Sequence, residues 1–145
     1  MQVTTMPYNT PRVHVRRLDH PSPSEVSEVI KLMRLAFEHT DLLHTLLSGN
    51  LSPARIDALH GCYVRAALVP GEGEIWVAEV DRTEAQGLRE MVGESIWFLP
   101  GSPFLSTERQ REAANLLGFA ALVGEEQTQW FLNYVTVRFA LCIRR

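Results

Sequence analysis

The residues of this chain that could do chemistry are scattered carboxylates and single nucleophiles. Glu79 and Glu94 each lie in a strand-like segment, where a carboxylate could act as a base beside a sheet. The surrounding pattern favours a plainer interpretation, in which both carboxylates face solvent on half-buried strands. Ser48 lacks the Gly-x-Ser-x-Gly context of a hydrolase nucleophile, and Cys62 lies mid-helix, where burial makes a thiol inert. We therefore assign no catalytic residue from these positions.

The histidines do not form a metal site by their spacing. His39, His44 and His60 fall at the end of one predicted helix, in a loop and in a second predicted helix. No carboxylate accompanies them at the fixed spacing that zinc sites show. We expect no bound metal.

Two short apolar segments must position these side chains. Residues 74–81 and 91–101 are rich in β-branched and aromatic residues and are bounded by turn residues, so they predict an antiparallel hairpin. Trp76 and Trp97 lie in these segments. Their position favours the inner face of the sheet, in the core, over the alternative that they line an acceptor cleft.

The remaining segments predict one strand and several helices around this hairpin. Alternation predicts a first strand, and helical periodicity with capping residues predicts the helices, the first of them capped by Ser24. The strand covers 13–18, a short helical turn lies within 40–50, and the helices cover 23–39, 52–68, 106–123 and 125–133. The order predicts an α+β (mixed α/β) domain with an antiparallel central sheet flanked by helices.

The composition suits one soluble domain. The chain has 145 residues, of which 46% are hydrophobic, and a net charge of −3, so we expect neither nucleic acid nor a membrane as a partner. Its two cysteines lie far apart and predict free thiols in a reducing compartment. No apolar run predicts a membrane span or a signal peptide. We expect a cytoplasmic protein.

Four motifs in this order resemble the N-terminal half of a GNAT-superfamily N-acetyltransferase. They are Ala-Phe at 36–37, Ile-Trp-Val-Ala-Glu at 75–79, Val-Gly-Glu-Ser-Ile-Trp-Phe-Leu-Pro-Gly at 92–101 and Ser-Thr-Glu-Arg-Gln at 106–110. The similarity covers 13–134 and is greatest to the divergent fungal members of that superfamily.

The resemblance implies a transfer of an acetyl group from acetyl-CoA to an amine, carried by a small molecule or by a protein. It also implies that Phe37, Asp41, His44 and Trp97 contact the acceptor, because the loop around Asp41 and His44 overhangs the acceptor in that family. Polar surface residues are equally expected in such a loop.

The chain departs from the family pattern at the turn that holds the pyrophosphate of acetyl-CoA. That turn reads Gln/Arg-x-x-Gly-x-Gly/Ala, whereas here 109–114 has Glu112 in place of the first glycine, and a carboxylate repels a phosphate. Residues 118–124 have the wrong spacing. We therefore assign no cofactor-binding residue and expect a domain truncated before this motif, weakly active or inactive. The alternative is a non-catalytic interaction module that forms a homodimer through an open sheet edge.

The predicted organisation has three parts. Residues 1–12 form a flexible N-terminus, 13–134 the GNAT-like domain, and 135–145 a tail in which apolar and polar residues alternate. The alternation predicts an edge strand that completes the sheet. The alternative is a non-native tail that arises from intron read-through.

Overall fold

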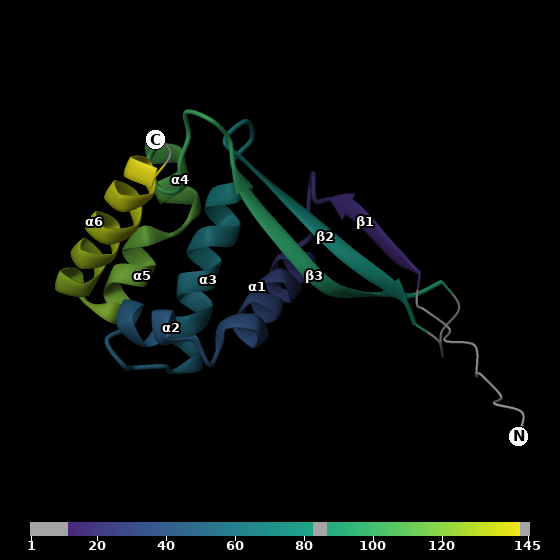
Figure 1. Ribbon diagram of the computed structural model, residues 1–145, viewed down its shortest axis with the longest axis horizontal. Coiled ribbons are helices and arrows are strands. Elements are labelled where there is room, and N and C mark those ends of the chain that lie inside the picture. Colours follow the sequence, from purple (N-terminus) through teal and green to yellow (C-terminus); the bar gives the residue numbers. More distant parts are fainter. Residues whose placement is uncertain (1–11, 83–86, 143–145) are drawn as a thin grey trace, which may run out of the picture.

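The computed structural model describes residues 12–82 and 87–142, which form an antiparallel sheet and a group of helices (Figure 1). The elements in chain order are β1 (Val13–Arg17), α1 (Pro23–Phe37), α2 (Asp41–Leu46), α3 (Pro53–Ala67), β2 (Gly73–Asp81), β3 (Arg89–Phe98), α4 (Glu108–Ala113), α5 (Leu116–Val123) and α6 (Glu125–Cys142). The predicted α+β class is confirmed. The predicted N-terminal segment lies outside the described residues, apart from Arg12.

The sheet has the order β1-β2-β3, and both pairs are antiparallel. Residues that face each other across an antiparallel pair share one face of the sheet. Ile75 and Val77 are buried and define the inner face. Trp76 and Trp97 therefore lie on the outer face, with 39% and 60% of their surfaces exposed. The prediction that these tryptophans belong to the core is wrong, because side chains alternate between faces and the described helices cover only the face of Ile75.

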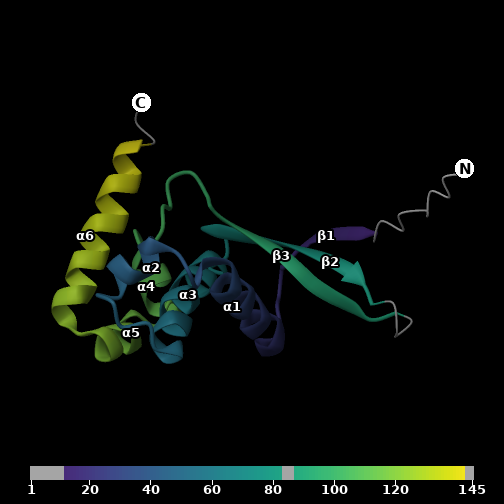
Figure 2. The same cartoon turned by 60° about the horizontal axis from the view of Figure 1, so that its bottom comes forward.

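Helices α1 and α3 cover the inner face of the sheet, and no described helix lies on its outer face (Figure 2). The hairpin of β2 and β3 extends past α1, away from the other helices (Figure 1). Two apolar clusters hold these layers. One joins the inner face to α1 and α3 around Val29, Met33 and Val64, and the other joins α2, α3, α5 and α6 around Phe119 and Phe131.

The start of α1 is held by a capping box. The Ser22 side chain accepts a hydrogen bond from the backbone N–H of Glu25, and the Glu25 carboxylate accepts one from the backbone N–H of Ser22 at 2.8 Å. Pro23 occupies the first helical position, where its fixed φ fits and its missing N–H is not needed. The cap is therefore Ser22, and the prediction of Ser24 is wrong by two residues.

The predicted helix at 106–123 is broken into α4 and α5. Asn115 adopts a left-handed conformation (φ 54°, ψ 50°), which asparagine tolerates better than most residues. Its side-chain oxygen accepts a hydrogen bond from the N–H of Gly118 at 3.3 Å and so caps α5. The chain turns at this residue, and α5 packs against α3.

The tail is helical and not a strand over residues 135–142. Helix α6 begins at Glu125, in agreement with the helical segment that the sequence predicts there, and continues to Cys142. The predicted edge strand at 135–145 is therefore wrong over 135–142, and 143–145 lie outside the described residues. A strand needs a neighbour to satisfy its backbone N–H and C=O groups, whereas a helix satisfies them within itself.

Candidate functional site

Three of the four predicted acceptor residues lie close together in the chain at the α1–α2 connection. Phe37 ends α1, Asp41 begins α2, and His44 lies within α2; all three are exposed. Trp97 lies on the outer face of the sheet, opposite the face that the helices cover. The fold therefore does not place Trp97 with the other three residues.

His60 of α3 lies beneath Phe37, with ring centroids 6.2 Å apart. Its side chain is buried, and its Nδ1 atom has no hydrogen-bond partner in the described part of the chain. Burial lowers the pKa of His60 and so favours the neutral form of the ring. Among the residues that the structure describes, no group of His, Cys, Asp and Glu side chains could hold a metal ion.

Glu79 is buried and paired rather than solvent-facing. Arg16 of β1 donates to its carboxylate at 2.8 Å and also donates to Glu25 of α1 at 2.8 Å. The hydrogen bonds from Arg16 to Glu79 and Glu25 raise the pKa of the arginine further above its ordinary value. Arg16 thus balances the charge of the Glu79 carboxylate and ties β1, β2 and α1 together, which makes Glu79 unsuitable as a base.

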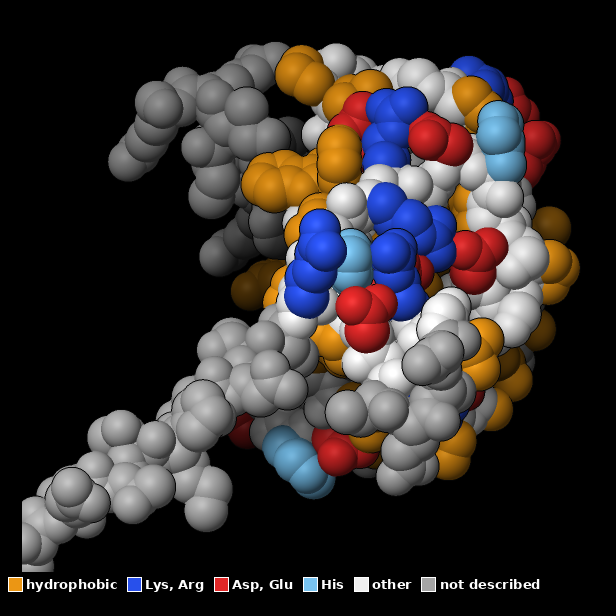
Figure 3. All heavy atoms as spheres, turned by 90° about the vertical axis from the view of Figure 1, so that its right-hand side faces the viewer, with side chains coloured by type: hydrophobic (Ala, Val, Ile, Leu, Met, Phe, Trp, Pro, Cys, Tyr) orange, Lys and Arg blue, Asp and Glu red, His pale blue; other side chains and the backbone are white. Residues whose placement is uncertain are grey.

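Further charges continue this network toward the tip of the hairpin. Asp81 lies 3.3 Å from His14 and 3.3 Å from Arg89, and a hydrogen bond from His14, followed by that from Arg89, lowers the pKa of Asp81. Arginine side chains and carboxylates interleave on this side of the molecule (Figure 3). Opposite charges are matched here, so this surface is a structural network of ion pairs.

Glu94 of β3 differs from Glu79 in having no partner among the residues described. It faces Val77 across the β2–β3 pair and therefore lies on the inner face of the sheet. Its carboxylate is half-buried and makes no hydrogen bond or ion pair within the described residues. Burial raises the pKa of Glu94. The prediction of a solvent-facing side chain is wrong for both glutamates, because both lie on the inner face of the sheet.

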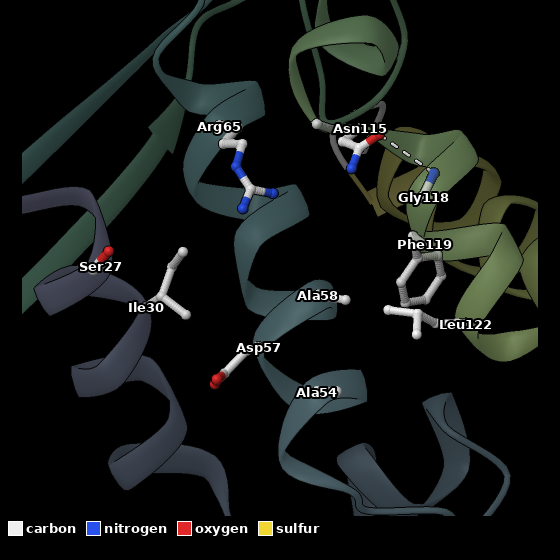
Figure 4. Close-up of a pocket in the computed structure, with 11 residues that line it drawn as sticks. Ser27, Ile30, Ala54, Asp57, Ala58, Arg65, Asn115, Gly118, Phe119 and Leu122 are labelled. Carbon is white, nitrogen blue, oxygen red and sulfur yellow. Dashed lines mark hydrogen bonds between the residues drawn. The ribbon is translucent and has the colours of Figure 1, made fainter. Parts of the chain in front are cut away.

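A groove of about 370 Å³ lies between α1, α3 and α5 (Figure 4). Space for it exists because Ala54, Ala58 and Gly118 contribute small side chains or none. Ile30 and Phe119 are apolar residues of its walls. The groove is therefore open between three helices that the core holds in place.

Two of the described residues that line the groove are charged, and one of them is paired while the other is not. The Asp57 carboxylate accepts two hydrogen bonds from Nη1 of Arg34, both at 3.1 Å. Arg65 of α3 also lines the groove and has no hydrogen-bond or ion-pair partner among residues 12–82 and 87–142. A second hollow of about 580 Å³ adjoins the groove, and both are lined by Ser27, Ile30 and Arg65.

Sequence reasoning missed this groove. A signal for it was present, because Ala54, Ala58, Gly61 and Arg65 recur at spacings of four, three and four and so share one face of α3. A helix face of small residues that ends in a cation indicates a hollow with a charge at its edge.

Comparisons with known proteins add no relative to this picture. The chain matches no protein-family model, and no similar curated protein or solved structure was found. Within the described residues, no helix combines the length and the apolar character that crossing a membrane requires. Function must therefore be inferred from the geometry of these sites and from the resemblance of the sequence motifs.

Proposed function

We propose that this chain is the acceptor-binding portion of a GNAT-like N-acetyltransferase, with a small-molecule or protein amine as acceptor. The observation that supports this proposal most is the arrangement of β1, β2 and β3 as one antiparallel sheet whose inner face is covered by α1 and α3. That arrangement agrees with the order of the motifs that carry the resemblance. The α1–α2 connection, with Phe37, Asp41 and His44, would then overhang the acceptor.

Glu94 is the residue best suited to take a proton from the acceptor. An alkyl amine is mostly protonated at neutral pH and becomes a nucleophile only after it loses that proton. A carboxylate accepts such a proton more effectively when its pKa is raised toward the working pH. Burial raises the pKa of Glu94, and its carboxylate has no partner among the described residues, whereas Glu79 is engaged by Arg16.

The segment that would have to hold the acyl donor does not fit a pyrophosphate. Arg109 donates to the buried carboxylate of Glu72 at 3.0 Å, so this cation is already paired. Glu112 is an exposed carboxylate in α4, at the place of the first glycine of the family pattern. We therefore expect acetyl-CoA to bind this chain only weakly.

Acetyl-CoA titration tests the enzymatic proposal. Thermal unfolding is followed with increasing acetyl-CoA, and the release of free CoA thiol is measured with a panel of amines. Acetyl-CoA at a concentration 100 times its Kd would add about 2.7 kcal/mol to the apparent stability of the chain. We expect a small shift at millimolar acetyl-CoA and slow thiol release that Glu94→Gln abolishes. The absence of both signals at millimolar acetyl-CoA would remove the enzymatic function from this chain.

One observation favours a second candidate function, a homodimerisation module. The outer face exposes Val13, Val15 and Trp97, which are 56%, 66% and 60% exposed. In the described part of the chain, β1 and β3 each pair on one side only, so each leaves an open edge. An open edge pairs readily with the same edge of a second copy, because two antiparallel strands are related by a two-fold axis.

Sedimentation equilibrium separates this candidate from the first. A dimer that dissociates on dilution is expected for the native chain and for Leu117→Lys, since Leu117 lies on α5 and is 87% exposed. Trp97→Lys, on the outer face of the sheet, should be monomeric at the same concentrations. A native chain that stays monomeric at every concentration excludes the dimer.

A further inference from the structure

The groove between α1, α3 and α5 has the features of a small-molecule site that is separate from the proposed acceptor region. We propose that it binds a monocarboxylate with an apolar body, with the carboxylate on Arg65 and the hydrocarbon in the adjoining hollow. This inference does not depend on the acetyltransferase proposal, because none of the residues that carry it belongs to the α1–α2 connection or to β3.

Charge determines which head group fits the groove. Asp57 is the only carboxylate among the described residues that line the groove or the hollow, and Arg34 already neutralises it. Arg65 is half-buried and has no partner in the described part of the chain. The planar guanidinium group presents parallel N–H donors that match the two oxygens of a carboxylate. A single anionic head group would therefore complete the charge balance of the groove.

Asn115 supplies a second donor at the same end of the groove. Its Oδ1 atom is used by the N–H of Gly118, which leaves the amide nitrogen as a donor without a partner among the residues described. Arg65 and Asn115 lie on α3 and at the start of α5, at the same end of the groove (Figure 4). Because both groups donate hydrogen bonds and the carboxylate of the groove is already paired, an anionic head group is favoured over an ammonium group.

The adjoining hollow determines the rest of the ligand. Pro21, Val26, Leu68 and Val69 line it, and Arg65 is the only charged residue among its described lining residues. A volume of about 580 Å³ lies in the range of sites that bind small molecules. Hydrocarbon placed there leaves water for an apolar wall, which is favourable in proportion to the area buried. A compact apolar body attached to one carboxylate fits both regions at once.

Calorimetry with a matched pair of ligands tests the proposal on the full chain without acetyl-CoA. The pair is 4-phenylbutyrate and its neutral amide, 4-phenylbutyramide, which differ only in the charge of the head group. We expect the native chain to bind the carboxylate at least about tenfold more tightly, as one charge-assisted hydrogen-bonded contact predicts. Arg65→Gln should bind both ligands equally, whereas Arg55→Gln, on the same helix but outside both hollows, should keep the preference.

Two outcomes would overturn the proposal. One is equal binding of the two ligands by the native chain, or no binding of either at millimolar concentration. The other is a preference for the carboxylate that persists in Arg65→Gln.

If Arg65→Gln does not fold, Ala113→Leu provides the decision, because Ala113 is exposed and lines the hollow. This larger side chain should weaken the binding of both ligands, and an unchanged affinity would show that they bind elsewhere. Glu94→Gln should leave carboxylate binding unaltered, so the acetyltransferase proposal can fail independently.

Discussion

Replacing Glu94 by glutamine should make the protein more stable at neutral and alkaline pH. The carboxylate is half-buried and has no partner in the described residues, so its charged form lacks part of its hydration without compensation. Burial raises the pKa of Glu94 above its ordinary value of 4.5. A raised pKa in the folded state means that the native protein binds the proton more tightly than the unfolded chain. The contribution of this group to the free energy of unfolding is therefore fully present below pH 4.5 and is lost as the pH rises through the folded-state pKa.

The size of the effect follows from the partial burial. An unpaired polar group that is fully buried costs about 1–3 kcal/mol in protein mutational data. Glu94 remains partly exposed, and water screens the remainder of its charge, so about 1 kcal/mol is expected for the native chain at pH 8. For a domain of this size, about 1 kcal/mol corresponds to about 4 °C in Tm. Glutamine has nearly the same shape and never carries the charge, so Glu94→Gln recovers this amount.

Urea denaturation at pH 4 and pH 8 measures this difference directly. Glu94→Gln and the native chain should have similar free energies of unfolding at pH 4 and differ by about 1 kcal/mol at pH 8, with the variant more stable. Glu28→Gln is the control, because Glu28 is exposed on α1 and has no partner among the described side chains. Two results would contradict this account of Glu94. One is a difference between variant and native chain that is the same at both pH values, and the other is a native chain that is more stable than the variant at pH 8.

Three further predictions concern the scaffold. Gly73→Ala should destabilise by about 1–3 kcal/mol in urea denaturation, because the new Cβ atom would lie 2.6 Å from the Cα atom and 2.6 Å from the carbonyl oxygen of Ala67. Gly93→Ala, whose Cβ atom meets only a side-chain carbon at 3.7 Å, should increase the free energy of unfolding by up to about 1 kcal/mol. Equal effects of the two variants would show that the backbone of Ala67 does not crowd Gly73. Phe131→Ala should cost about 3–5 kcal/mol, and a loss below about 1 kcal/mol would show that α6 does not pack on the core. The lowered pKa of His60 predicts that stability falls as the pH falls below 6.5. In urea denaturation between pH 7 and pH 5, the free energy of unfolding of His60→Gln should therefore change less with pH than that of the native chain. Parallel pH profiles of the two proteins would assign the fall to other groups.

Elements with strong local signals are predictable from the sequence. Strands β2 and β3 and helices α1 and α3 combine clear periodicity with turn or capping residues at their ends. The break between α4 and α5 is not predictable, because it depends on one residue, Asn115, that adopts a left-handed conformation where a continuous helix also fits the pattern. The prediction for the tail is wrong because alternation says nothing about whether a segment will pair as a strand, and the described part of the tail does not pair with the open edge of β3.

The candidate sites depend on tertiary facts that the sequence does not contain. Strand aromatics usually lie in the core, which is why the sequence predicts that position for Trp97, but the described helices cover only one face of this sheet. Glu79 and Glu94 look equivalent in the sequence, and only the fold distinguishes them, since Arg16 reaches one and not the other. Arg65 has a helical signal of its own, but its lack of a partner becomes visible only when the surrounding helices are in place.

The capping box of α1 has a consequence beyond the helix itself. One carboxylate oxygen of Glu25 accepts from the Ser22 backbone, and the other accepts from Arg16, which also holds Glu79. The first turn of α1 and the pairing of β1 with β2 therefore share one side chain and should open together as a single cooperative unit. In native-state hydrogen exchange, the amides at the start of α1 and those of β1 should report the same opening free energy, even though they belong to different kinds of secondary structure.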